Sequence, residues 1–347
     1  MNILERMSHF NIPGVSVSYF EDGKVNWNKC FGTMKKGTEN HVTENSIFHA
    51  CSISKMITTL SVLRLAQDGK LDLHKDINEY LTSWKIKDNN FTETKKVTLA
   101  NLLSHQAGLH DPEGSFSPYK SDDKTPTLID ILTGATTYHT EEVTVKYIPE
   151  TDCEYSDAGF VVVAKLLEDV FSETVPQIAQ RIVFNPLGLK RTFFWEIGKD
   201  SFDKIEDCVV GHDNDGEVVA ELRACYPNIE GAALWTTPSE LAWIVIDIIN
   251  AYQGKDSKIL NHGMAKFMLS PFGCAEDVGI GVFLVSDSNG RPCFVSQGWG
   301  VGMQCKLRAY YKDQSGVVVM INSEPGVEQN RSLVGEIIEY VSKNHML

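Results

Sequence analysis

The sequence has 347 residues and a formal net charge of −14, and 42% of its residues are hydrophobic. This length predicts about two domains, or one large unit with an inserted subdomain. The acidic balance argues against nucleic acid or an anionic membrane as a main partner, because the neutralisation of phosphates needs clustered lysine and arginine. We expect the acidic surface to serve solubility.

The first part of the chain combines a hairpin signal with a helix. Alternating residues on both sides of the turn at Glu21-Asp22-Gly23-Lys24 predict two antiparallel strands, over residues 15–20 and 25–32. From Ser52 on, apolar residues recur at the spacing of one helical face, and Gly69 is placed as the C-cap of that helix.

The middle of the chain is predicted to be mostly helical, and its last part contains most of the strands. The predicted helices cover residues 97–109, 157–170 and 175–184. From about residue 205 strands return, with helices at 238–250 and 331–344 and strands at 279–285, 293–296, 303–311 and 316–322.

Strands at both chain ends with helices between them predict an α/β fold, in which an antiparallel β-sheet flanked by helices is built from both ends. Residues 1–60 and 205–347 are expected to form this α/β subdomain. Residues 61–204 are expected to form a mostly helical inserted subdomain, and the active site is expected at the interface of the two.

Eight cysteines are scattered along the chain without any C-x-x-C spacing. This distribution is typical of free thiols in a reducing compartment and gives no metal or redox motif. The N-terminus lacks the basic and apolar segments of a signal peptide, and no run has transmembrane length. We expect a cytoplasmic protein with no cofactor; an exported protein whose leader is absent from this sequence would give the same pattern.

Ser52 and Lys55 form the candidate catalytic motif. Their spacing of three residues on a helix places the amine one turn from the hydroxyl. A neutral amine can take the proton of a serine hydroxyl and so activate it as a nucleophile. The S-x-x-K motif of acyl-transferring serine enzymes combines these two groups. The structural alternative is an N-cap serine followed by a surface lysine. The same spacing recurs in polar stretches, at Ser117/Lys120, Ser121/Lys124 and Ser201/Lys204.

Together with the order of the elements, this motif resembles the serine β-lactamase and penicillin-binding-protein superfamily. The resemblance is to the class C-like branch, which includes D,D-peptidases, D-aminopeptidases and family VIII esterases. It is carried in family order by Phe48–Lys55, the Leu65–Leu73 segment, the Leu102–Leu109 segment, Tyr155–Phe160, Asn185–Leu189 and the Gly231–Thr237 segment. It implies a β-lactamase/transpeptidase-like fold with Ser52 as the nucleophile.

Tyr155 matches the tyrosine of the family's Y-x-N motif, and the resemblance implies that it forms the acid/base pair with Lys55. A neighbouring cation favours the ionised form of a phenol, so Tyr155 could also relay the proton of Ser52. Asp157 replaces the asparagine of the motif. An ionised carboxylate donates no hydrogen bond. We expect Asp157 either to pair with Lys55 or to select a substrate that carries a free amine.

The family's third motif, K-T-G or H-x-G, is best matched by Ser296-Gln297-Gly298, which Trp299 follows. The cation or imidazole that binds a substrate carboxylate is here a serine, whereas the glycine is kept. The resemblance implies that the backbone amides of Ser52 and Trp299 form an oxyanion hole. The Trp299 side chain is expected either to form a wall of the substrate pocket or to pack at the end of a strand.

The expected function is that of a serine hydrolase that cleaves a small amide, peptide or ester, with D-configured or amine-bearing substrates among the candidates, and that has weak or no β-lactamase activity. Its partner would be this small-molecule or short-peptide substrate, and the oligomeric state stays open. The alternative is a catalytically impaired penicillin-binding-like homologue that binds a ligand or partner. Neither a G-x-S-x-G elbow nor H-E-x-x-H occurs, and His105 is expected to be structural.

Overall fold

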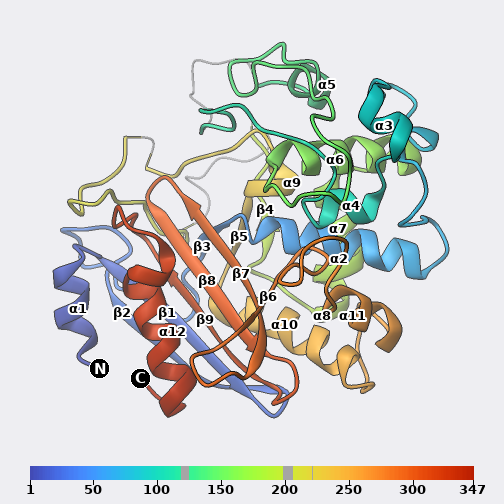
Figure 1. Ribbon diagram of the computed structural model, residues 1–347. Helices are drawn as coiled ribbons and strands as arrows, with labels where there is room; N and C mark the ends of the chain where they lie inside the picture. Colours follow the sequence, from blue (N-terminus) through green and yellow to red (C-terminus); the bar gives the residue numbers. More distant parts are fainter. Residues whose placement is uncertain (119–124, 198–205, 221) are drawn as a thin grey trace.

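The computed structural model describes residues 1–118, 125–197, 206–220 and 222–347. Its main element is an antiparallel sheet with the strand order β2-β1-β9-β8-β7-β6 (Figure 1). The strands are β1 (Gly14–Glu21), β2 (Lys24–Gly32), β6 (Phe283–Ser286), β7 (Pro292–Gly300), β8 (Met303–Tyr310) and β9 (Ser315–Ile321). The predicted fold class, an antiparallel sheet flanked by helices, is confirmed.

The sheet joins the two ends of the chain. β1 and β2 form the predicted hairpin, in which Asp22 and Gly23 both adopt positive φ, at 53° and 74°. β1 also pairs with β9, so that Val17 lies opposite Val319. The N-terminal hairpin therefore continues the sheet that the C-terminal strands form.

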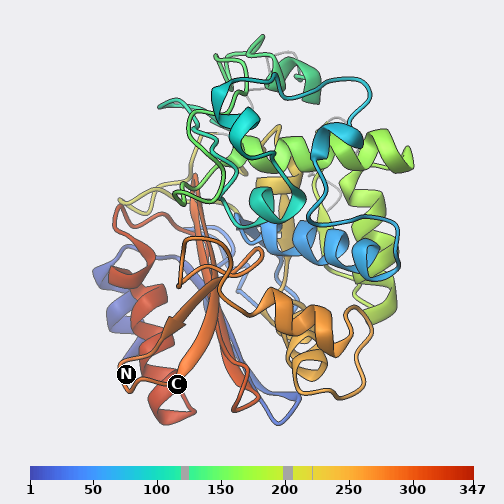
Figure 2. The ribbon, with the colours of Figure 1, turned by 45° about the vertical axis from the view of Figure 1, so that its right-hand side comes forward.

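Helices cover both faces of this sheet (Figure 2). On one face, α1 (Ile3–His9) and α12 (Leu333–Asn344) bury an apolar cluster with β1 and β9, whose core includes Val17, Ile337 and Ile338. On the other face, α10 (Pro238–Tyr252) packs against β1 and β9. Its N-cap is Thr237, whose side chain accepts from the backbone amide of Glu240.

The remaining helices pack around α2 and α6, on the side of the molecule away from α1 and α12 (Figures 1 and 2). They are α2 (Ser54–Gln67), α3 (Asn90–Thr94), α4 (Leu99–Leu103), α5 (Leu128–Leu132), α6 (Asp157–Phe171), α7 (Val175–Ala179), α8 (Asn185–Leu187), α9 (Ile229–Ala232) and α11 (His262–Met268), with the short helical turns η1 (Ile77–Glu79) and η2 (Gln180–Phe184). A further helical turn, η4 (Gln329–Arg331), instead lies beside α12 and β8.

A second, smaller sheet links the main sheet to these helices. It has the order β3-β5-β4, with β3 (Phe48–Cys51), β4 (Phe193–Phe194) and β5 (Leu234–Thr236). Most of the helices between α2 and α8 fall within residues 61–204, but α2 itself begins before this range. None of the described helices is both long and apolar enough to cross a bilayer.

Two sequence expectations were wrong in their details. The segment 279–285 was expected to be a strand throughout, but β6 begins at Phe283. Gly281 before it has φ 73°, and a Cβ there would lie 2.2 Å from the side-chain oxygen of Thr59, so the chain turns tightly against α2. Helix α1 was not expected at all, because its seven residues are too few for a clear periodic signal.

Candidate active site

Ser52 lies in the tight turn that connects strand β3 to helix α2. Cys51 before it adopts a positive φ of 46°, and the amide of Ile53 donates to the carbonyl of Ala50 at 3.1 Å. The first helical residue is Ser54, so the expectation that the helix begins at Ser52 was wrong by two residues. The turn leaves Ser52 half-buried at the mouth of a pocket instead of capping the helix.

Lys55 is buried beside Ser52 and donates to three acceptors. Its Nζ lies 3.3 Å from Ser52 Oγ, 2.6 Å from Asp157 Oδ1 and 2.9 Å from the carbonyl oxygen of Gly231. Three acceptors match the three protons of an ammonium group. Burial alone would lower the pKa of Lys55, but the charge and hydrogen bond of Asp157, together with Tyr155, outweigh burial and raise this pKa above its ordinary value. Lys55 is therefore charged in this arrangement.

Asp157 takes the first of the two expected roles, since it pairs with Lys55. It is the first residue of α6, and its Oδ1 also accepts from Asn228 Nδ2 at 2.9 Å. Asp111, which is not part of α6, stabilises the first turn of this helix, because its Oδ2 accepts from the backbone amide of Asp157 at 2.5 Å. Burial and the charge of Asp157 raise the pKa of Asp111. Neither Asn228 nor Asp111 was identified from the sequence, since each contacts Asp157 only through the fold.

Tyr155 and His105 form an aromatic wall next to Lys55. The Lys55 Nζ lies 4.9 Å from the centre of the Tyr155 ring, whose centre is 4.4 Å from that of His105. Nδ1 of His105 accepts from the amide of Ser156 at 3.2 Å, and burial together with the Lys55 charge lowers the pKa of His105 to about 3. Burial raises the pKa of Tyr155, although Lys55 acts in the opposite direction. Both rings are thus neutral at pH 7.

Strand β7 lies directly against the end of β3. A Cβ at Gly298 would lie 2.3 Å from the carbonyl oxygen of Ala50 and 2.8 Å from Cβ of Cys51. Only glycine allows this approach, which brings the β7 backbone next to the Ser52 turn. Ser296 is buried, whereas Trp299 keeps 43% of its surface exposed.

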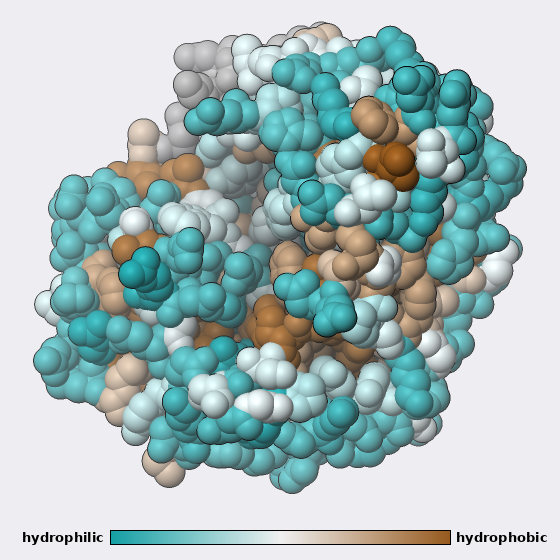
Figure 3. All heavy atoms as spheres, in the orientation of Figure 1, coloured by the Kyte–Doolittle hydropathy of each residue, from teal (hydrophilic) through white to brown (hydrophobic). Residues whose placement is uncertain are grey.

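The structure brings most of the predicted site residues together. One pocket is lined by Ser52, Lys55, Tyr155, Ser296 and Gln297, together with His105, Leu103 and residues of the segment 278–283. In the orientation of Figure 1, the molecular surface is hollowed near its middle, and hydrophobic side chains are exposed there (Figure 3). Asp157 contacts Lys55 and Gly298 contacts β3, but Trp299 is not among the lining residues. No cluster of His, Cys, Asp or Glu side chains suited to a metal occurs within the described residues.

The three other S-x-x-K matches lie wholly or partly outside the described residues. Lys120, Ser121, Lys124, Ser201 and Lys204 lie outside the described residues. Ser117 is described, and its hydroxyl donates to the carbonyl of Gly114 in an exposed turn.

Behind the Lys55 pair lies a buried acid, Glu230. Its side chain is 2% exposed, and its Oε1 has no hydrogen-bond partner among the described residues. Burial raises the pKa of Glu230 to about 8. Between the ordinary pKa of a glutamate and about pH 8, Glu230 is therefore protonated in the folded protein but ionised in the unfolded chain.

Glu230→Gln should flatten the pH dependence of stability. An acid whose pKa is raised on folding makes the folded state less stable as pH rises from the unfolded pKa, about 4.3, to the folded pKa. The parent should lose on the order of a few kcal/mol of unfolding free energy between pH 5 and pH 8 through this group. Urea unfolding at both pH values measures this loss. A variant whose unfolding free energy falls as steeply as that of the parent would contradict the assignment.

Comparison with known proteins agrees with this architecture. The family model described as Beta-lactamase matches residues 2–341. Protein flp of Staphylococcus aureus is 24% identical over 264 residues, which cover 75% of this chain and 46% of that protein. Penicillin-binding protein 4 of Amycolatopsis lactamdurans is 25% identical over 184 residues, covering 52% of this chain and 45% of its own. The chain thus matches less than half of the length of these relatives.

Solved structures share the fold over almost the whole chain. The octameric penicillin-binding protein homologue from Pyrococcus abyssi has a TM-score of 0.79 at 22% identity, covering 99% of this chain and 75% of its own. The D-amino acid amidase from Ochrobactrum anthropi SV3, complexed with D-phenylalanine, has a TM-score of 0.78 at 20% identity. The match covers 99% of this chain and 98% of the amidase. The Beta-lactamase/D-alanine carboxypeptidase from Yersinia pestis has a TM-score of 0.74 at 16% identity. The match covers 99% of this chain and 96% of that protein's chain.

These likenesses to solved structures concern the fold, whereas the family model matches the sequence of almost the whole chain. The chain belongs to the beta-lactamase family, within the superfamily of serine β-lactamases and penicillin-binding proteins.

Proposed function

We propose that the protein is a serine hydrolase that forms an acyl-enzyme on Ser52 and cleaves a small amide, peptide or ester. The observation that carries this proposal is the Lys55 amine, 3.3 Å from Ser52 Oγ in a pocket that Tyr155 also lines. A hydroxyl needs an adjacent base to act as a nucleophile, and Lys55 is close enough to serve as that base.

In the proposed reaction, Ser52 Oγ attacks the substrate carbonyl carbon while its proton passes to Lys55. Because Lys55 is charged at rest, it first has to release one proton, either to solvent or along its contact with Asp157. The proton taken from Ser52 is then delivered to the leaving group through Lys55 or the Tyr155 phenol, and water releases the acyl group in a second step. We assign the oxyanion donors to the amides of Ser52 and Trp299, because Gly298 holds β7 against β3.

The finer substrate preference is also a proposal. The likeness to a D-amino acid amidase supports D-configured or amine-bearing substrates. A substrate ammonium that bound Asp157 would compete with Lys55, which already occupies Oδ1. Ser296 supplies no charge at the position where the superfamily usually binds a carboxylate close to the reacting bond. This supports weak or absent β-lactam turnover.

A covalent trap tests the proposal. The protein is incubated with an activated acetyl aryl ester and, separately, with a fluorescent penicillin, and the intact mass and the modified peptide are determined. We expect an adduct on Ser52 in the parent and in Ser296→Ala, and none in Ser52→Ala. The Ser296 variant is the matched control, because that serine lines the same pocket.

The same experiment separates the alternative, a catalytically impaired homologue that binds a ligand or partner. Such a protein would give neither ester turnover nor a Ser52 adduct in the parent. An adduct that forms at equal rates in the parent and in Ser52→Ala would also overturn the assignment of Ser52.

A further inference from the structure

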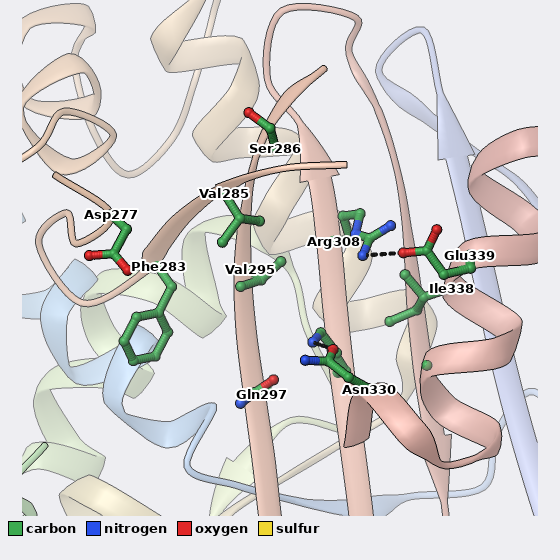
Figure 4. A pocket seen from close by; sticks show the side chains of 12 residues that line it. Asp277, Phe283, Val285, Ser286, Val295, Gln297, Arg308, Asn330, Ile338 and Glu339 are labelled. Atoms are coloured by element: carbon green, nitrogen blue, oxygen red, sulfur yellow. Dashed lines mark hydrogen bonds and ion pairs between the residues drawn. The ribbon is translucent and has the colours of Figure 1, made fainter. Parts of the chain in front are cut away.

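A second cavity, of about 470 Å³, adjoins the active-site pocket on the α12 side of the sheet (Figure 4). Residues of β6, β7, β8 and α12 line it, together with Asn330. Phe283 and Gln297 line both this cavity and the pocket of Ser52. The pocket and the cavity therefore meet at these two side chains, so the cavity lies next to the place where a substrate of Ser52 would bind.

Two cations lie at the floor of the cavity. Lys306 and Arg308 are two residues apart on β8, so both project from the same face of the sheet, opposite Gln297 and Val295 on β7. Lys306 is only 4% exposed and Arg308 only 8%. Lysine and arginine are seldom buried to this degree unless they are paired.

The positive charge of these two residues is only partly compensated. Arg308 Nη2 donates to Glu339 Oε1 at 2.6 Å, and Lys306 Nζ donates to the neutral Oδ1 of Asn330. Nε and Nη1 of Arg308 have no hydrogen-bond partner within the part of the chain that is described. Burial and the charge of Arg308 lower the pKa of Lys306 to about 8. Of these two buried cations, Arg308 thus contacts a carboxylate directly, whereas the hydrogen bond of Lys306 is to a neutral amide.

A further acid, Asp277, also lines the cavity. It lies beside Phe283, on the side away from Arg308 and Glu339 (Figure 4). Its position leaves the floor around Lys306 and Arg308 cationic. A carboxylate that entered there would supply the missing counter-charge through charge-assisted hydrogen bonds.

We propose that this cavity binds a carboxylate that the substrate carries away from its reacting bond, with Lys306 as the specificity-determining residue. The inference rests on the proposed hydrolase activity at Ser52 and narrows its substrates to acidic amides, peptides or esters. Ser296, which lines the catalytic pocket, is uncharged. Acidic groups of the substrate would then be bound by Lys306 and Arg308 instead.

Two matched pairs of aryl esters test the proposal. In one pair the leaving group is meta-hydroxybenzoate or meta-hydroxybenzamide, with an acetyl group on each. In the other pair the acyl half is glutarate or its monoamide, with the same phenol. We expect the parent to show a kcat/KM about tenfold or more higher for the carboxylate member of at least one pair, the effect of one charge-assisted hydrogen bond.

The variants assign this preference to the cavity. Lys306→Met should reduce the carboxylate-to-carboxamide ratio of kcat/KM about tenfold, and Lys306→Arg should largely keep it. Lys343→Met is the matched control, because Lys343 lies 3.9 Å from Glu339 but is not among the residues that line the cavity. It removes the same charge and should leave the ratio unchanged.

The results distinguish this inference from the proposed function. If the esters are hydrolysed through Ser52 but neither pair shows a preference, or if Lys306→Met leaves the ratio unchanged, the carboxylate site is refuted and the hydrolase stands. If no ester is hydrolysed and Ser52 forms no adduct, the proposed function itself fails, and the carboxylate site fails with it.

Discussion

Lys55→Met should lower ester turnover about a thousandfold, within the range of about 10²–10⁴ that a positioned acid or base contributes. The substitution removes the amine 3.3 Å from Ser52 Oγ, while the methionine fills a similar volume in the buried site. It also leaves Asp157 without its cation. Removal of one partner from a buried ion pair costs about 3–5 kcal/mol, and we expect the lower end because the Asp157 side chain is 21% exposed.

The double variant Lys55→Met/Asp157→Asn separates these two effects. It removes the uncompensated carboxylate, so it should regain most of the stability that Lys55→Met loses in urea unfolding. Turnover should stay as low as in the single variant. Recovery of activity in the double variant would mean that the single variant was inactive because its site was distorted, and Lys55 would no longer be needed as the base.

Much of the fold could be predicted because local signals and overall topology agree. The Asp22-Gly23 hairpin, the α10 region after Thr237 and the strands β8 and β9 each carry a clear periodic or turn signal. The short elements were harder to predict. The four residues of β3 and the seven of α1 are placed by their tertiary contacts, which a local pattern does not contain.

The candidate site could be predicted only where residue type and spacing are coupled. Ser52 and Lys55 are three residues apart in the sequence, and Tyr155 and Gly298 fall in segments that resemble family motifs. Asn228 and Asp111 approach Asp157 from distant parts of the chain, 71 and 46 residues away, so no spacing rule connects them. The charge state of Lys55 could not be predicted from the sequence either, because it depends on the balance between burial and the nearby carboxylate of Asp157.

Asp157→Asn, which restores the asparagine of the family motif, should move the pH profile of ester hydrolysis toward acid. Only neutral Lys55 can take the proton of Ser52, and below its pKa the neutral fraction falls tenfold for each unit. Asp157 raises the pKa of Lys55, whereas burial lowers it. Without the carboxylate burial dominates, so the neutral fraction at pH 7 rises and kcat/KM should increase by about tenfold or more.

The stability of the Asp157→Asn variant should fall, whereas its activity at pH 7 should rise. A lysine whose pKa is raised on folding contributes stability that is fully present below its unfolded pKa and is lost as pH rises through the folded value. Asp157→Asn removes this contribution, so the variant should unfold more easily than the parent at neutral pH, and the difference should shrink above about pH 10. Higher activity combined with lower stability would mark Asp157 as a residue that holds Lys55 in its charged form.

The measurement is kcat/KM for an aryl ester across pH 5 to 10, corrected for spontaneous hydrolysis. Asn228→Ala is the matched control, since it removes the 2.9 Å hydrogen bond to Asp157 Oδ1 but keeps the carboxylate beside Lys55. Its profile should stay where the parent's lies. A uniform loss of activity in Asp157→Asn, with the profile unmoved, would show that the carboxylate itself has to accept the proton that Lys55 releases.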